Sequence, residues 1–210
     1  MYLHPITKLQ HEHGNMWRVQ VAIRNQLDLL ENGGVPDAVL LANAFYYMRK
    51  FPSAVHHPKE DLVFDRLVKM GAPVQDLVKR LHAQHVELYV LEEMLIELAL
   101  QLPAGRSESR NRTLLLGRQY LATQAEHMKT EEQTVFPQAR KRLRSRDWKA
   151  IREQAREIED PMFDGKASER FQYLYDYMMR EVGDEDLAAA HAAAVPGRKP
   201  KSAPAAQARK

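Results

Sequence analysis

Hydrophobic side chains recur at steps of three and four residues along the first segment of the chain. Positions three and four apart lie on the same face of an α-helix, so this spacing predicts a helix with one inward face. A histidine and a glutamine share that face with apolar neighbours. The face consists of Ile6, Leu9, His13, Met16, Gln20, Ile23, Leu27 and Leu30.

Further segments show the same helical spacing. The third segment carries a row from Val74 to Leu98 that includes His85. The second segment is interrupted by Pro52 and Pro58, and each proline removes a backbone donor, so we expect a kink or a local break there. The second row consists of Leu41, Phe45, Met48, Val55, Val63 and Leu67.

Glycine and proline occur in groups between these segments, which argues against a β-sandwich or a barrel with closely spaced turns. The groups are Asn32-Gly33-Gly34, Met70-Gly71-Ala72-Pro73 and Leu102-Pro103-Ala104-Gly105. Long helices joined by short connections run antiparallel to their neighbours. The sequence therefore predicts an all-α protein built as an up-down-up-down four-helix bundle.

The pattern changes after the bundle. We expect the bundle to cover residues 1–145 and one or two short helices to pack on it within residues 146–187. Asp147 is expected to be the N-cap of the first of them. Residues 188–210 are mostly Ala, Pro, Lys and Arg with little to bury, so we expect a disordered tail.

The basic character of the chain belongs to that tail. The whole chain has 31 Lys and Arg, 28 Asp and Glu, and a net charge of +3. Five of the cations and none of the acids lie in residues 188–210, which leaves the remainder slightly acidic. A helical scaffold whose basic tail binds nucleic acid is one alternative function, but nothing in the bundle encodes base recognition, so we do not expect nucleic acid as a partner.

The absence of cysteine excludes disulfides, iron–sulfur clusters and thiol catalysis. Any metal site must then be built from imidazole and carboxylate ligands. No apolar run approaches the roughly 20 residues of a membrane span, and the N-terminus lacks the apolar core of a signal peptide. We therefore expect a cytoplasmic protein without membrane contact.

Two short pieces of the chain resemble each other, because each holds His-x-x-x-Glu followed by an apolar residue and Phe. The pairs are His56 with Glu60 and His127 with Glu131. Residues four apart lie one above the other on a helix, so such a pair can bind one ion, or its carboxylate can bridge two. For a lone pair, a surface contact between histidine and glutamate is the ordinary alternative.

His13 and His85 change this picture, because both lie within apolar rows of their helices. Burying an imidazole without a partner costs about 1–3 kcal/mol. A single buried histidine is usually a hydrogen-bonded core residue, but here all four long segments bring a histidine inward. Two of the segments add a carboxylate, and a pair of cations would account for the whole set.

Four motifs resemble, in the same order, those of the hemerythrin-like family, the HHE cation-binding domains. They are Leu9-Gln10-His11-Glu12-His13, the run from Phe51 to Asp61, Leu81-His82-Ala83-Gln84-His85, and the run from His127 to Pro137. The resemblance covers about residues 1–145 and implies a non-heme di-iron centre, with Glu60 and Glu131 as bridging carboxylates. It implies that the metal ligands are His13, His56, Glu60, His85, His127 and Glu131. Two Fe ions are expected, and the ligand types also suit Mn or Zn as substitutes.

One position departs from the oxygen-carrying hemerythrins, which place a second histidine one turn along the third helix. Tyr89 occupies that position here. We therefore expect one metal to lack a protein imidazole and to keep an open position, which disfavours reversible O₂ carriage. His82 and His57 are the candidate substitutes, although an ideal helix rotates His57 about 100° away from His56.

Two carboxylates adjoin expected ligands. Glu12 precedes His13 and Glu132 follows Glu131. Helix geometry turns adjacent residues aside, so we expect both to face solvent; the alternative is that they orient imidazoles as outer partners.

These expectations describe a protein that binds a di-iron centre and senses or handles O₂, NO, peroxide or iron. Its expected partner is a small diatomic or peroxide ligand. A di-metal carboxylate oxidase or peroxidase is the alternative, but ferritin-like bundles use Glu-x-x-His on two helices, whereas here histidine comes first. The sequence leaves open whether turnover occurs and whether the chain forms oligomers.

Overall fold

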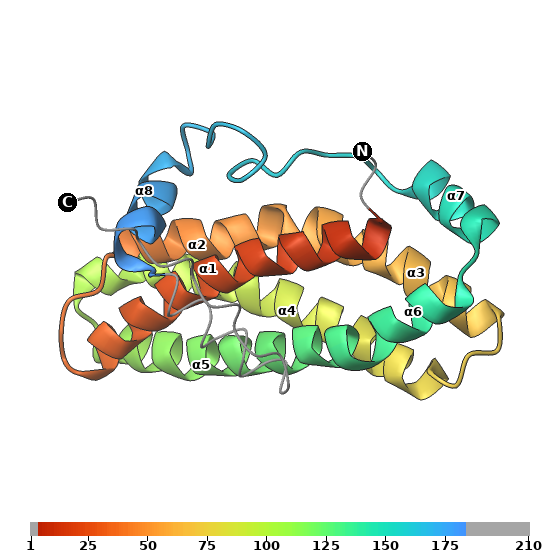
Figure 1. Cartoon of the computed structure of the whole chain (residues 1–210). Helices are drawn as coiled ribbons and strands as arrows, with labels where there is room; N and C mark the ends of the chain where they lie inside the picture. The colour runs from red at the N-terminus through yellow and green to blue at the C-terminus, as the bar shows by residue number, and fades with distance from the viewer. Residues whose placement is uncertain (1–3, 184–210) are drawn as a thin grey trace, which may run out of the picture.

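A computed structural model describes residues 4–183 of the chain, and the regular structure within that range is entirely helical. The four long segments are α1 (Pro5–Glu31), α2 with α3 (Ala38–Lys50 and His57–Lys69), α4 (Gln75–Gln101), and α5 with α6 (Ser107–Thr130 and Phe136–Arg142). Each packs against its neighbours in sequence, and α1 also packs against α5, which closes the ring (Figure 1). The predicted four-helix bundle is confirmed. No helix among the described residues is long and apolar enough to span a membrane.

Short turns separate the long helices where the sequence groups its glycines and prolines. Gly33 and Gly105 adopt φ angles of 80° and 68°, in the left-handed region that glycine enters without a steric penalty. The side chain of Asp37 caps α2 by accepting a hydrogen bond from the amide of Leu40 at 2.9 Å. A 3₁₀ turn, η2 (Leu102–Ala104), ends the third segment.

Two of the long segments contain one wide, π-helical turn each. These turns are η1 (Pro52–His56), between α2 and α3, and η3 (Glu131–Val135), between α5 and α6. In η1 the carbonyl of Phe51 accepts hydrogen bonds from the amides of both Val55 and His56, at 2.9 and 3.1 Å. The expected interruption is thus a single widened turn, and the helix continues beyond it. Such turns add a residue and change the direction of the side chains that follow.

Two short helices follow the bundle. α7 (Ser145–Gln154) packs on α3, and α8 (Gln172–Glu181) packs on α1 and α2 (Figure 1). Asp147 is not the N-cap of α7; it lies in the first turn, and its carboxylate accepts a hydrogen bond from the amide of Arg144 at 2.9 Å. The loop between the two helices is held to the bundle by a 2.8 Å hydrogen bond from the Tyr47 hydroxyl to Asp160. Residues 188–210, the expected disordered tail, lie outside the described residues.

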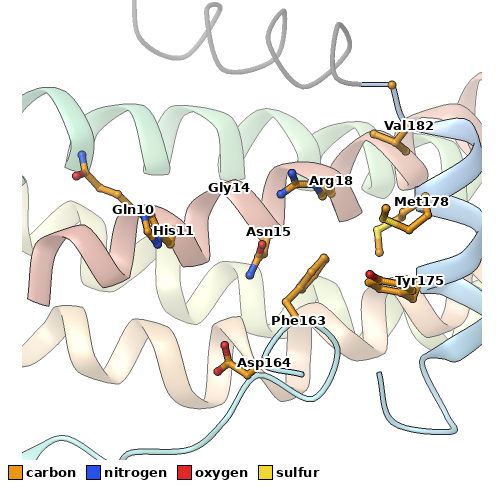
Figure 2. Close-up of a pocket in the computed structure, with 12 residues that line it drawn as sticks. Gln10, His11, Gly14, Asn15, Arg18, Phe163, Asp164, Tyr175, Met178 and Val182 are labelled. Carbon is orange, nitrogen blue, oxygen red and sulfur yellow. The ribbon is translucent and has the colours of Figure 1, made fainter. Parts of the chain in front are cut away.

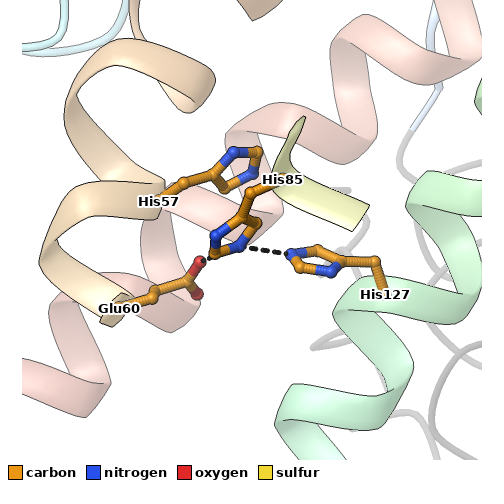
Figure 3. A group of neighbouring side chains, drawn as sticks. All are labelled: His57, Glu60, His85 and His127. Carbon is orange, nitrogen blue, oxygen red and sulfur yellow. Dashed lines mark hydrogen bonds and ion pairs between the residues drawn. The ribbon is translucent and has the colours of Figure 1, made fainter. Parts of the chain in front are cut away.

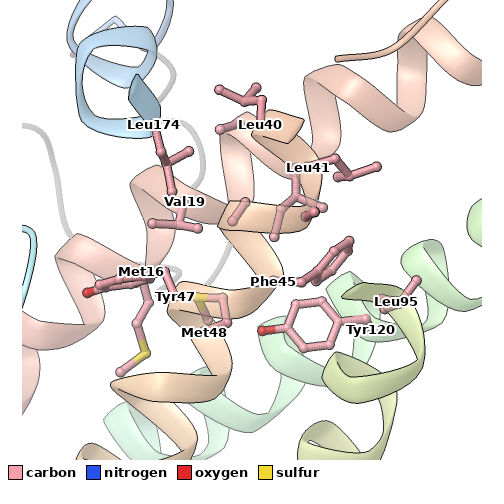
Figure 4. Close-up of a cluster of buried hydrophobic side chains, with 14 of the residues drawn as sticks. Met16, Val19, Leu40, Leu41, Phe45, Tyr47, Met48, Leu95, Tyr120 and Leu174 are labelled. Atoms are coloured by element: carbon pink, nitrogen blue, oxygen red, sulfur yellow. The ribbon is translucent and has the colours of Figure 1, made fainter. Parts of the chain in front are cut away.

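Two apolar clusters fill the bundle, and a polar layer lies between them. The larger cluster includes Met16, Phe45, Met48, Leu95 and Tyr120 (Figure 4). The smaller cluster includes Ile6, Leu9, Phe64, Leu81 and Phe136. In each long segment the change from one cluster to the other falls at an inward histidine, so the fold itself places the imidazoles at one level.

Candidate metal centre

Seven buried side chains meet in the polar layer between the two apolar clusters. They are His13 from α1, His56 from η1, His57 and Glu60 from α3, His85 from α4, His127 from α5 and Glu131 from η3. Six of them are the residues that the sequence motifs single out, and the structure brings all six together. His57 is the addition.

The side chains form two groups with ligand geometry. Cluster 1 consists of His13, His56 and Glu60, and cluster 2 consists of His57, Glu60, His85 and His127 (Figure 3). Within each cluster every residue offers a nitrogen or oxygen atom, and these atoms lie within 4.8 Å of one another. Glu60 belongs to both clusters, so the two sites share its carboxylate.

The two carboxylates each divide their oxygens between the clusters. Oε1 of Glu60 lies 3.3 Å from Nε2 of His13, and its Oε2 lies 3.7 Å from Nε2 of His85. Oε2 of Glu131 lies 3.5 Å from Nε2 of His13, and its Oε1 lies 3.0 Å from Nε2 of His127. This arrangement is what two carboxylates would adopt to bridge a pair of cations.

Four of the five imidazoles, all except that of His57, point their Nε2 atoms into the centre and their Nδ1 atoms outward. The Nδ1 atoms of His13 and His56 lie 3.1 and 2.6 Å from carboxylate oxygens of other helices. Nδ1 of His85 lies 3.0 Å from Asp61, and that of His127 lies 3.2 Å from Gln84. Metal-binding histidines are typically held in this way, since the outer hydrogen bond fixes the ring and its tautomer.

Several inward atoms have no hydrogen-bond partner in spite of their burial. They are Nε2 of His56, both ring nitrogens of His57, Oε2 of Glu60 and both oxygens of Glu131. In addition, the Nε2 atoms of His85 and His127 face each other at 3.0 Å. Some of these atoms lie within ion-pair distance of one another, such as Nε2 of His56 and Oε1 of Glu60 at 2.9 Å, but without the geometry of a hydrogen bond. Buried polar atoms are nearly always hydrogen bonded, so atoms that converge in this way fit ligands of an ion.

His57 is fully enclosed by the other imidazoles. Its ring stacks on that of His85, with centroids 4.1 Å apart and planes 7° from parallel, and it meets His127 edge-on. Burial lowers the pKa of His57 well below its usual value, and the positive charges of His85 and His127 lower it further. A neutral imidazole with free nitrogens is the form that binds a metal. His57 thus places a third imidazole in cluster 2, beside those of His85 and His127, at the centre where we expected one imidazole to be missing.

Without a metal ion, the inward carboxylates would keep protons on some of these rings. Burial alone would lower the pKa of His13, but hydrogen bonds to Glu132 and Glu60 outweigh it and raise the pKa to about 10. The pKa of His85 rises to about 11 against the same effect of burial, through Asp61 and the two inward carboxylates. Bound cations would take the place of these protons.

Glu12 and Glu132 face the protein and not solvent, so the expectation of solvated side chains is wrong for both. Oε2 of Glu12 lies 2.6 Å from Nδ1 of His56, and Oε1 of Glu12 accepts a hydrogen bond from Nζ of Lys59 at 3.2 Å. Glu132 lies 3.1 Å from His13. They are outer partners that orient ligand imidazoles, the alternative that the sequence left open.

Tyr89 and His82 take no part in the two clusters. Tyr89 is partly exposed, and its hydroxyl accepts a hydrogen bond from Arg49. His82 lies on the rim, where its Nε2 is 3.1 Å from Oδ1 of Asp61. His82 therefore does not compensate for the histidine missing at position 89.

The comparisons with known proteins agree with this geometry. Residues 4–139, well over half of the chain, match the family model described as the hemerythrin HHE cation binding domain. The chain belongs to the hemerythrin HHE family. This hemerythrin-like chain finds no match among the curated proteins. The family and the two clusters together establish a cation-binding domain and leave the identity of the cation open.

Two cavities lie near this hemerythrin-like centre. One of about 70 Å³ is lined by Glu12, Lys59 and Val63, and thus reaches the outer partner of His56. A larger, solvent-open one of about 930 Å³ lies between α1 and α8, with Arg18 and Phe163 in its lining (Figure 2). None of the seven residues of the centre lines either cavity, and the smaller one comes nearer to the centre because Glu12, which contacts His56, is in its lining.

Proposed function

We propose that this protein holds a non-heme di-iron centre in clusters 1 and 2 and uses it to sense or handle O₂, NO, peroxide or iron. The observation that carries the proposal is that Glu60 and Glu131 each present one oxygen to each cluster. Two shared carboxylates suit two adjacent cations, and five imidazoles with two carboxylates suit iron, with manganese or zinc as substitutes. Bound iron would supply one-electron chemistry and affinity for small oxygen and nitrogen ligands.

A small ligand is best accommodated on the side of cluster 1. Cluster 1 offers two imidazoles, whereas cluster 2 offers three. The 70 Å³ cavity lined by Glu12 and Lys59 lies behind His56 of cluster 1, because Glu12 contacts the outward Nδ1 of His56. Because His57 adds a third imidazole to cluster 2, O₂ stands beside NO and peroxide as a candidate ligand.

Metal analysis of the full chain, purified without oxygen, tests the proposal. One iron is expected for each of the two clusters, together with a charge-transfer absorption band that appears on oxidation. Protein that contains less than one iron per chain, and whose melting temperature does not rise when iron is added, would contradict it. Decay of added peroxide in the presence of a reductant then separates a catalyst, the alternative oxidase or peroxidase function, from a sensor.

A further inference from the structure

Glu92 is a buried carboxyl group outside the metal centre. It lies on α4, is 0 % exposed, and is held by two hydroxyl groups from other segments. The Ser53 hydroxyl donates to its Oε2 at 2.7 Å, and the Tyr120 hydroxyl donates to its Oε1 at 3.2 Å. Neither partner carries a charge.

Burial dominates the ionisation of Glu92. It raises the pKa of Glu92 to about 8, although hydrogen bonds from Ser53 and Tyr120 and the positive charge of Arg49 on α2 oppose the rise. Glu93, beside it on α4, adds a small upward contribution. Arg49 does not neutralise Glu92, because its guanidinium binds Glu93 and Tyr89 instead. Near neutral pH the Glu92 carboxyl is therefore mostly protonated, and it loses its proton as the pH rises through about 8.

The three long segments that carry cluster 2 also carry a second polar layer, which consists of Ser53, Glu92 and Tyr120. Glu92 follows His85 by seven residues and Tyr120 precedes His127 by seven, which places each about two helical turns, or roughly 10 Å, along its helix. Between the layers lies Gln124, which is fully buried and whose Oε1 has no hydrogen-bond partner. A row of polar groups thus runs from the metal centre into the larger apolar cluster, where Figure 4 shows Tyr120.

A change of charge at the metal centre would shift the pKa of Glu92. At about 10 Å and an effective dielectric constant of about 20, one unit of charge shifts a pKa by roughly one unit. Both sites are shielded from water, so solvent screens this interaction weakly. Ser53 is half-buried, and its hydroxyl provides a route for a proton between solvent and Glu92.

We propose that Glu92 is a proton-exchanging residue linked to the charge of the metal centre. When the centre gains one electron from an external one-electron donor, the Glu92 carboxylate takes up one proton from solvent and becomes a carboxylic acid. When that electron leaves, the O–H bond of Glu92 breaks and the proton returns to solvent. One charge of each sign enters or leaves, so the net charge of the buried interior is conserved. The inference rests on the proposed redox-active centre.

The first arm of the test uses the metal-free full chain and infrared spectroscopy. The wild-type protein should show the C=O stretch of a protonated buried carboxyl at about pH 6, and this band should disappear as the pH passes about 8. Glu92→Gln, which keeps the side-chain volume, should lack the band. Glu97→Gln is the matched control, because it removes an exposed carboxylate of the same helix that does not bind Arg49, and it should retain the band.

The second arm measures the midpoint potential of the iron-loaded chain from about pH 6 to about pH 9. In the wild type and in Glu97→Gln, the reduction equilibrium should change by about tenfold in total as the pH rises through the pKa of Glu92, because the shift is roughly one pKa unit; this lowers the midpoint potential by about 59 mV for one electron. Glu92→Gln should lose this dependence. Tyr120→Phe, which keeps the carboxyl but removes a hydrogen bond to its charged form, should move the dependence to higher pH.

An unchanged pH dependence in Glu92→Gln would overturn the inference while leaving the di-iron proposal intact. Protein that binds no redox-active metal would overturn both, and the metal content of the same sample distinguishes the two results. If Glu92→Gln does not fold, the direction of the shift in Tyr120→Phe decides, since no shift there also overturns the link.

Discussion

Glu60 and Glu131 divide their oxygens between the two clusters, and this division is the residue-scale basis for two ions in place of one. Each carboxylate comes four residues after an inward histidine. Oε1 of Glu60 lies 2.9 Å from Nε2 of His56, and Oε1 of Glu131 lies 3.0 Å from Nε2 of His127. Burial alone would raise the pKa of Glu60, but the nearby His56 and His13 hold it well below its usual value. Glu60 is therefore ionised and able to bridge.

Replacement of Glu60 tests the bridge. Glu60→Gln keeps the volume but removes the charge and one acceptor oxygen, so both clusters should lose affinity and the iron content should fall to less than one per chain. Elemental analysis of the purified variant measures this. Asp65→Asn, an exposed neutralisation on the same helix, should retain the wild-type content. Equal iron contents in the two variants would refute the bridge.

A substitution of His57 tests metal binding at cluster 2 separately from binding at cluster 1. His57→Ala should weaken metal binding at cluster 2 by at least about 100-fold, the upper end of the effect of losing an outer partner. Cluster 1 should remain loaded, so the metal content should drop from two ions to one. His82→Ala is the control at a rim histidine. A His57→Ala protein that still binds two ions would show that this imidazole is not a ligand.

The raised pKa of Glu92 should make the free energy of unfolding of the chain depend on pH. Its pKa rises from an unfolded value of about 4.3 to about 8 in the folded chain, so the folded state holds the extra proton between these values. Its contribution to the free energy of unfolding should therefore decrease by about 1.4 kcal/mol per pH unit as the pH rises through this window. Urea unfolding of the metal-free chain at several pH values should show this decrease, relative to Glu92→Gln. If the free energy of unfolding changes with pH in the same way in both proteins, the pKa of Glu92 is not raised.

At the scale of elements, the sequence predicts the helices well and the widened turns poorly. Apolar spacing and grouped glycines are local signals, and they fix the four long segments. A π-helical turn depends on how one helix must meet its neighbours. In the sequence, Pro52 at the start of η1, and Pro58 and Pro137 just beyond the two turns, mark an interruption but not its type. For that reason an ideal helix places His57 aside, whereas the structure turns it into cluster 2.

The turn η1 can be tested by removing one residue. Deletion of the exposed Ala54 should convert the wide turn to a regular one, which would rotate α3 relative to α2 by about 100°. We expect loss of metal binding at both clusters and a lower melting temperature by circular dichroism. Ala54→Ser, which keeps the chain length, should leave both unchanged. A deletion variant that retains two ions would show that the wide turn does not position the ligands.

At the scale of the whole molecule, the bundle places a polar layer between two apolar clusters, and ions would stabilise that layer. The sequence predicts the level of this layer, because each histidine interrupts an apolar row. It does not predict the outer partners Glu12 and Glu132, since their contacts come from other helices. Long-range pairing of this kind has no signature in local spacing.

Metal loading should therefore stabilise the fold in a pH-dependent way. Binding at about 1,000 times the dissociation constant adds about 4 kcal/mol, which raises the melting temperature of a chain of this size by roughly 10 °C. His13 and His85, with pKa values of about 10 and 11, must each lose a proton to bind a metal. Metal affinity should accordingly fall by up to about 100-fold for each unit that the pH is lowered. Competition titrations with a chelator at two pH values measure this, and an affinity independent of pH would contradict it.

The geometry of the bundle leads us to expect two cations side by side, bridged by Glu60 and Glu131. A crystal structure of the iron-loaded chain with anomalous scattering measured at the iron edge tests it most directly. We expect two peaks, one against His13 and His56 and the other against His57, His85 and His127, with both carboxylates between them. A single peak, or peaks only at the protein surface, would contradict it.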